Sequence, residues 1–244
     1  MIINNLFNDI EYTKFVESDI ISIDESIKHS KQEVIKEHRT KVYVNGNQVM
    51  TLLCTASYLD YLVIGRLISE GMIHNINNIE KLNICEYGLR AQVSLKPNIK
   101  LDIKTTQDEV GSCCTDNQSL FKTETLPSPI TNQKHFNPKD IFEMAAAFHN
   151  DSKLHKLTQG THAAYLFLDK KIIFDCEDIG CHNALDKIIG YIYLNKLNLK
   201  IVLYSPQVLF LLIWHVKQYM LVLVQSYQKP FQPMMLYLLQ KNII

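Results

Sequence analysis

The stretch from residue 163 to residue 195 changes its hydrophobic period once, and this change constrains the fold more than any other feature. The segment "AAYLFLDKKIIFDCED" predicts two short β-strands that meet around Asp169 to Lys171. Beyond it, apolar residues recur at helical spacing, at Leu185, Ile188, Ile189 and Ile192. This spacing predicts an amphipathic helix from Asn183 to about Asn195, packed on a sheet. The pattern favours an α/β protein with mixed strands.

The amino-terminal half predicts a strand, a second strand and a helix. In "KVYVNGNQVMTLLCT", Asn45-Gly46 lies between two β-rich runs, which is a strong signal for a hairpin with a tight turn. Thr55 or Ser57 is placed to cap a helix with apolar residues at Leu59, Leu62 and Val63. Gly71 is placed to end that helix. A further strand is expected from Leu89 to Leu95.

Residues 122–138 carry three prolines and little periodicity, so the main linker is expected there. Asn137-Pro138 then predicts a helix start, with the helix running through Ala145 to Phe148. This linker is expected to lie inside a domain that covers residues 1–224. No internal repeat is visible in the sequence.

Composition and charge exclude several classes of function. The 25 basic and 25 acidic residues balance, so no global field recruits nucleic acid or an anionic membrane. Charged and polar residues interrupt the apolar segment from Ile201 to Val224 before it reaches the length of a membrane span. Six cysteines without a signal-peptide pattern indicate reduced thiols. We therefore expect a cytoplasmic protein with its function in a local site.

The segment "CEDIGCHNALDK" lies where a strand ends and a helix begins, and a helix start favours an anion such as phosphate. A zinc site would use Cys176, Cys181, His182 and His162, but no C-x-x-C pair supports it. Packing of the cysteines as small apolar side chains is the alternative. Both interpretations stay open on the residue types alone.

The segment "GSCCTDNQ" places Cys113 and Cys114 among small and polar residues, which predicts an exposed turn. An exposed thiol can ionise, attack and carry sulfur, whereas a buried thiol cannot. The alternative is an incidental pair of surface cysteines.

Five segments in this order resemble a known family: "VNGNQVMTLLCT", "GRLISEGMI", "GSCC", "TQGTHAAYLF" and "CEDIGCHNALDKIIG". The chain resembles the FdhD/NarQ-type accessory sulfurtransferases needed for formate dehydrogenase activity, from about Val42 to Leu203. The resemblance implies a cytidine-deaminase-like fold, a mixed sheet with flanking helices. It does not imply deamination, because the H-x-E and P-C-x-x-C zinc motifs are missing. No bound zinc is expected.

The resemblance also implies partners and roles. A cysteine desulfurase would donate a persulfide, a loop cysteine would hold it, and the sulfur would pass to the bis-molybdopterin guanine dinucleotide form of the molybdenum cofactor for formate dehydrogenase. A homodimer is expected by the same analogy. Cys113 matches the family's first loop cysteine and would be the catalytic carrier. The residues that match the family's polar cluster would bind the nucleotide end of the cofactor: Thr161, His162, Asp178, Gly180, His182 and Asn183. In this cluster Asp178 would accept from the guanine edge. Lys187, one helical turn later, would either lie near a phosphate or be a solvated lysine, and we favour the solvated lysine.

Four departures from the family pattern bear on this expectation. Asp116 stands in place of the second loop cysteine, so a two-cysteine relay is absent and the role of Cys114 is open. Gln159 replaces a glycine, and Cys181 replaces an arginine that would contact phosphate. A cofactor-binding chaperone that moves no sulfur is therefore the alternative function.

The fourth departure is the tail, because the likeness fades after Ser205. Back-translation of the residues from Ser226 onward in a shifted frame can spell Leu-Ser-Lys-Ala-Val-Pro-Thr-Asn-Asp-Ala, which looks like the missing family stretch. We therefore hypothesise a frameshift near Val224, with residues 225–244 an aberrant tail. On this hypothesis the chain would be an inactive product, or one that loads sulfur but holds the cofactor weakly.

Overall fold

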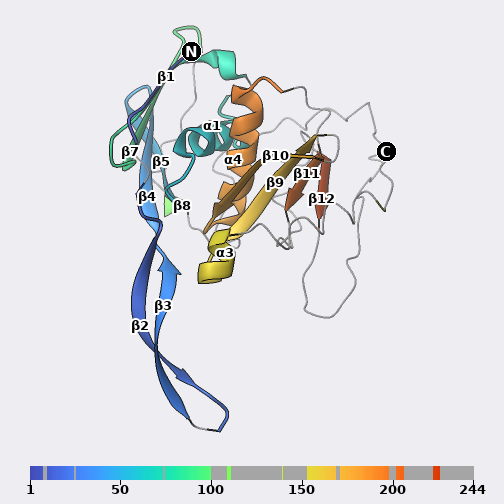
Figure 1. The fold of residues 1–244 in the computed structure, drawn as a ribbon. Helices are drawn as coiled ribbons and strands as arrows, with labels where there is room; N and C mark the ends of the chain where they lie inside the picture. Colours follow the sequence, from blue (N-terminus) through green and yellow to red (C-terminus); the bar gives the residue numbers. More distant parts are fainter. Residues whose placement is uncertain are drawn as a thin grey trace, which may run out of the picture.

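The computed structural model describes residues 1–7, 10–24, 26–73, 75–99, 109–110, 139, 153–168, 171–197, 202–205 and 222–225. The expected linker at 122–138 and the expected helix through Ala145 to Phe148 lie outside these residues. Within them the chain is a mixed α/β protein, with two helices between two sheets (Figure 1). The predicted α/β class is confirmed.

The larger sheet has the strand order β1-β6-β7-β4-β5-β8 in the described residues. Its strands are β1 (Ile2–Asn5), β4 (His38–Val44), β5 (Asn47–Cys54), β6 (Ile79–Ile84), β7 (Arg90–Leu95) and β8 (Glu109–Val110). β4 and β5 are antiparallel, and Asn45 and Gly46 between them have φ of 48° and 87°. Two successive positive φ values define the type I′ hairpin turn, so the predicted hairpin is confirmed.

The smaller sheet has the strand order β10-β9-β11-β12 in the described residues. Its strands are β9 (His162–Leu168), β10 (Lys171–Asp178), β11 (Val202–Ser205) and β12 (Val222–Gln225). The two strands predicted around Asp169 to Lys171 are confirmed as β9 and β10, and they pair antiparallel. β11 pairs in parallel with β12, which contains Val224, the residue near the expected frameshift.

The two helices between the sheets are α1 (Leu59–Ser69) and α4 (Cys181–Leu194). Both were predicted, and α4 begins two residues before the expected Asn183. A methyl group added at Gly65 would lie 1.7 Å from the carbonyl oxygen of Asp186, and one at Gly190 would lie 1.9 Å from that of Tyr61. The helix backbones therefore touch at two glycines, and this close approach fixes how α4 lies on α1.

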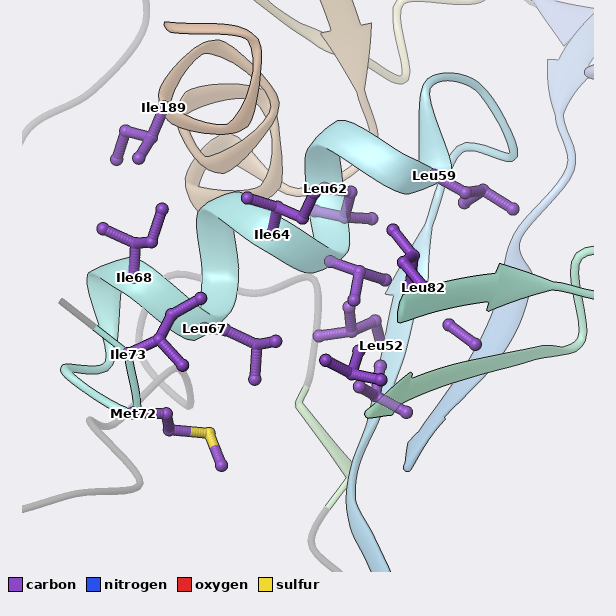
Figure 2. Packing of buried hydrophobic residues seen from close by; sticks show 14 of the residues in the cluster. Leu52, Leu59, Leu62, Ile64, Leu67, Ile68, Met72, Ile73, Leu82 and Ile189 are labelled. Carbon is purple, nitrogen blue, oxygen red and sulfur yellow. The ribbon is translucent and has the colours of Figure 1, made fainter. Parts of the chain in front are cut away.

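α1 packs its apolar residues against the larger sheet and against α4, as Figure 2 shows for Leu62, Leu67 and Ile68. Its end is the predicted one: Gly71 has φ of 70°, its N–H bonds to Ile68 O at 2.9 Å, and Met72 N–H bonds to Leu67 O at 2.9 Å. These two bonds form a Schellman motif, in which glycine takes the left-handed position. Among the described helices, none is long and apolar enough to cross a membrane.

Three smaller elements complete the described fold. The strands β2 (Thr13–Ile21) and β3 (Ile27–Ile35) pair only with each other in the described residues and form a ribbon that extends away from the sheets (Figure 1). A short 3-10 helix η1 (Ile76–Asn78) precedes β6. The short helix α3 (Lys153–Thr158) precedes β9 and contacts β3.

Candidate functional site

The segment with the most specific motif lies at the turn between β10 and α4, as predicted. β10 ends at Asp178 and α4 begins at Cys181, with Gly180 as its N-cap residue. The predicted polar residues Thr161, Asp178, His182 and Asn183 all lie near this turn, and each is at most 2% exposed. The turn is therefore an interior junction rather than an open rim.

The carboxylate of Asp178 is surrounded by donors from its own chain. Oδ1 accepts from Gly180 N at 2.8 Å and from Asn183 Nδ2 at 2.9 Å. Oδ2 accepts from Thr55 N at 3.1 Å and lies 2.6 Å from Lys187 Nζ. A carboxylate offers about four lone-pair positions, so these donors occupy it. In this arrangement Asp178 fulfils, as an internal anion at the start of α4, the role that the sequence argument gave to a phosphate.

The interpretation of Lys187 as a solvated lysine is wrong, because the residue is 0% exposed. Besides Asp178, its Nζ lies 3.2 Å from Thr55 O, 3.0 Å from Ser57 Oγ and 3.0 Å from Glu177 O. A buried ammonium is stable only when its three protons find acceptors. The sequence places Lys187 on the apolar helix α4, one turn after Asn183, and this position carries it into the interior.

The cap predicted for α1 is also wrong, for an informative reason. Tyr58 is the N-cap residue, with φ of 50° and no side-chain cap bond. Thr55 Oγ1 instead accepts from Ile179 N at 3.1 Å, and Ser57 Oγ accepts from Lys187. Thr55 therefore binds the distant β10–α4 turn, and Ser57 binds helix α4. We call Thr55, Asp178, Asn183 and Lys187 the Asp178 cluster, which joins the end of β5 to the start of α4.

Glu177 holds a second loop in the same way. Its Oε1 accepts from Leu154 N at 2.8 Å, and its Oε2 accepts from His155 N at 2.8 Å and from Thr161 Oγ1 at 2.7 Å. The carboxylate therefore caps α3 and fixes the segment that leads into β9. Sequence reasoning missed this role. The sequence contained a signal for it, because adjacent side chains of a strand point to opposite sides. Glu177 and Asp178, which are adjacent at a strand end, therefore bind different neighbours.

The remaining predicted residues have distinct environments. His162 starts β9 opposite Asp178 and is half-buried. His182 is 2% exposed, and its Nδ1 lies 3.6 Å from Cys181 Sγ. Asn183 Nδ2 also donates to Leu53 O at 2.7 Å. A side chain at Gly180 would press on the Asn183 amide nitrogen at 2.7 Å, so this N-cap position needs glycine.

Three of the four cysteines in the described residues are buried: Cys54, Cys176 and Cys181. Burial, helped by the nearby Asp178 charge, raises the pKa of Cys54 to about 12. Burial also raises the pKa of Cys176, whose Sγ donates to Ala184 O at 3.3 Å. A thiol with a raised pKa is a poor nucleophile. Cys85 is the partly exposed thiol of the described set, and Cys113 and Cys114 lie outside it.

The described residues contain no group of three or more His, Cys, Asp or Glu side chains suited to hold a metal ion. Cys176, one ligand of the alternative zinc site, is instead packed as a small apolar side chain against α4. Cys181 is 0% exposed, so a side chain at this position reaches an external anion only if the turn opens.

The geometry defines a mixed α/β protein in which a buried charged junction, the Asp178 cluster, ties the end of β5 to the start of α4. Comparison with known proteins shows the family to which the chain belongs. The model of the FdhD/NarQ family matches residues 35–207. The chain belongs to the FdhD/NarQ family.

Relatives with assigned functions support the same membership. The sulfur carrier protein FdhD of Halalkalibacterium halodurans is 31% identical over 197 residues, which cover 78% of this chain and 73% of the relative. That of Bacillus licheniformis is 32% identical over 183 residues, which cover 73% of this chain and 70% of the relative. A crystal structure described as a formate dehydrogenase accessory protein, from Desulfotalea psychrophila, has a TM-score of 0.69 at 18% identity, over 88% of this chain and 84% of that one. The last match supports the fold.

Proposed function

We propose that this protein is a sulfur carrier that supplies sulfur to the molybdenum cofactor of a formate dehydrogenase. Membership of the FdhD/NarQ family, with relatives named as sulfur carriers, is the observation that carries the proposal. The cysteine desulfurase donor, the bis-molybdopterin guanine dinucleotide acceptor and the cytoplasmic location belong to the same proposal.

Cys113 is the proposed carrier. Its thiolate attacks the outer sulfur of the desulfurase persulfide, so a new S–S bond forms on Cys113 and the desulfurase cysteine leaves as a thiolate. This exchange needs no external oxidant, because one S–S bond replaces another. The buried state of Cys54, Cys176 and Cys181 supports a carrier elsewhere in the chain, since a persulfide donor cannot reach them.

The nucleotide end of the cofactor is proposed to bind near the β10–α4 turn, through Thr161, His162, Gly180, His182 and Asn183. In this proposal Asp178 supports the turn from inside the protein and does not itself contact the nucleotide. Its four internal contacts hold the turn backbone in place, and it would touch the guanine only if one of those contacts opened. The deaminase-like fold is likewise an inference, supported by the mixed sheet and packed helices. Superposition on a cytidine deaminase structure tests it.

Incubation of the purified protein with a cysteine desulfurase and cysteine, followed by mass spectrometry, tests the carrier. We expect one added sulfur on Cys113, lost in Cys113→Ala and kept in Cys85→Ala, the matched control at the partly exposed thiol. A Cys114→Ala variant shows whether the neighbouring thiol contributes. Unchanged loading of Cys113→Ala would overturn the assignment. A parent protein that binds the cofactor and never loads sulfur would establish the chaperone alternative.

The tail hypothesis has its own test. The family match ends at residue 207, and residues 226–244 lie outside the described structure. Sequencing of the gene shows whether the shifted frame after Val224 encodes family-like residues. Complementation of a strain lacking its own carrier then compares this chain with a frame-restored version. We expect formate dehydrogenase activity from the restored version alone, and full rescue by this chain would end the hypothesis.

A further inference from the structure

The side chains predicted to bind the nucleotide are buried, so a nucleotide reaches them only after part of the chain has moved. Thr161, His182 and Asn183 are each 2% exposed. A side chain in this state has almost no surface to offer a ligand. What covers Thr161, the first of these residues in the chain, therefore decides how a nucleotide enters.

Helix α3 covers Thr161. On α3, His155 Nδ1 lies 2.6 Å from Thr161 O, and Glu177 Oε2 accepts both from His155 N at 2.8 Å and from Thr161 Oγ1 at 2.7 Å. His162, the next residue, lies opposite Asp178 in the pair of β9 and β10. Figure 1 shows α3 beside the start of β9 and the end of β10. The helix therefore lies over the part of the β10–α4 turn that contains Thr161.

Hydrogen bonds, rather than packing, hold α3 in this place. None of its six residues is buried, and Leu157 is 57% exposed. The amides of Leu154 and His155 bond to the two carboxylate oxygens of Glu177. Elements with few buried apolar contacts open at a low free energy. Movement of α3 therefore leaves the core intact.

The segment has a hinge on one side and a fixed anchor on the other. Gln159 has φ of 53°, a strained value for a residue with a side chain, and both Gln159 and Gly160 are exposed. Glu177 is fixed, because its carbonyl oxygen lies 3.0 Å from Lys187 Nζ of the Asp178 cluster. Resting on the nucleotide binding proposed above, we propose that α3 is a lid that hinges at Gln159-Gly160, with Glu177 as its latch.

Closing of the lid and binding of the nucleotide exclude each other. The Thr161 hydroxyl has one proton, and in the closed state it donates this proton to Glu177. Thr161 can donate to a nucleotide only when that bond breaks, so α3 stays displaced while the nucleotide is bound. The apparent affinity is then the affinity of the open state multiplied by the fraction of open molecules.

Weakening the latch tests the lid, because it should strengthen binding. Glu177→Gln replaces an accepting oxygen with an amide group that cannot accept from α3. We expect GDP, a fragment with guanosine and two phosphates, to bind this variant about tenfold more tightly than the parent, since the open fraction rises by that factor. Calorimetry measures the affinity, and stopped-flow mixing should show faster association. A residue that only positions the site would give weaker binding when changed.

Charge has to be separated from opening, because Glu177→Gln also removes a negative charge near an anionic ligand. Guanosine is neutral, so its affinity should rise by the same factor as that of GDP. Asp175→Asn is the matched control: it removes an equal charge from an exposed position two residues earlier on β10. We expect it to change either affinity by less than about twofold, because exposed charges are screened. A gain for GDP without a gain for guanosine would assign the effect to charge and overturn the lid.

Hydrogen exchange tests the direction of movement in the parent protein. Saturation with GDP should speed up exchange at the Leu154 and His155 amides, since both lose their acceptor on Glu177. Slower exchange at these two amides, or weaker binding by Glu177→Gln, would overturn the lid and leave the nucleotide site standing. Absence of GDP binding by both the parent and Glu177→Gln would overturn the nucleotide site, and the lid with it.

Discussion

The Asp178 cluster and the β2–β3 ribbon treat polar and apolar side chains in opposite ways. In the cluster, Asp178 and Lys187 have side chains that are 0% exposed, and each has several partners at hydrogen-bonding distance. In the ribbon, Phe15, Ile21 and Ile27 are each more than 60% exposed. One region buries full charges, and the other leaves large apolar groups in water.

The difference teaches that partners within the chain, rather than polarity, decide what this protein buries. The cluster draws on the segment between β5 and α1, the end of β10 and helix α4, so each of its charges has a counterpart. The ribbon extends beyond the sheets (Figure 1). In the described residues, neither of its outer edges pairs with another strand. If partners within the chain decide burial, single substitutions in the interior should cost far more stability than substitutions on the ribbon.

The largest effect is expected where the interior has no space at all. Gly190→Ala places a methyl group 1.9 Å from Tyr61 O, so α4 has to move away from α1. We expect a loss of about 4 kcal/mol or more in the free energy of unfolding, or no folded protein. The control is Gly46→Ala, which has φ of 87° and open space, and should cost only about 1 kcal/mol. Urea unfolding followed by circular dichroism measures both, and similar losses would contradict the close contact.

The elements predicted from sequence are those set by local patterns. The Asn45-Gly46 turn, the glycine end of α1 and the apolar spacing of α4 each involve neighbours within a few positions. The functions of Thr55 and Ser57 were missed because their partners are distant: Thr55 N and Asp178 are 123 positions apart. From sequence alone, a hydroxyl residue just before a helix is interpreted as the cap of that helix, because a distant hydrogen-bond partner is not visible in the sequence.

The ribbon was missed for a different reason. Neither of its faces is buried, so residues 13–35 lack the alternation of apolar and polar residues that marks a half-buried strand. For the candidate site, the motif gave the right location, between β10 and α4. It did not give the burial of Lys187, because lysine is almost never fully buried unless it is paired. Cys113 stays a prediction from the sequence, outside the described residues.

The second largest effect is expected at the buried ion pair. Lys187→Met leaves the Asp178 carboxylate buried without its cation, which should cost about 3–5 kcal/mol. Lys36→Met is the control, because Lys36 pairs with Glu11 at 2.9 Å with side chains that are 38% and 77% exposed, and should cost less than about 1 kcal/mol.

Adding Asp178→Asn to Lys187→Met should recover part of the loss, since the uncompensated charge is then removed. Chemical denaturation of the single and double variants gives the coupling. If Lys187→Met costs no more than Lys36→Met, water reaches the cluster and the contrast with the ribbon fails.

A smaller and local effect is expected at Glu177. Glu177→Gln replaces one of the two carboxylate oxygens that accept from Leu154 N and His155 N, so α3 loses a charge-assisted cap bond. We expect a cost of about 1–3 kcal/mol confined to α3. Hydrogen exchange should speed up at the Leu154 and His155 amides and not in α4. Glu80→Gln, at an exposed position on β6, is the control. Faster exchange throughout α4 would show that the Glu177 contacts and the Asp178 cluster do not act independently.

The smallest effect is expected at the tip of the ribbon. Ile21→Thr keeps the β-branched shape that suits a strand and removes apolar surface that is already 70% exposed. In dilute protein the free energy of unfolding should change by less than about 0.5 kcal/mol, as for surface substitutions in general. Ile188→Thr in α4, where the side chain is 0% exposed, is the matched control and should cost about 2 kcal/mol or more, because it leaves a void and buries a hydroxyl. Unfolding curves at low and high protein concentration separate the two sources of stability. If Ile21→Thr matters only at high concentration, the tip is stabilised by another copy; if it costs more than about 1 kcal/mol at every concentration, the tip packs on its own chain.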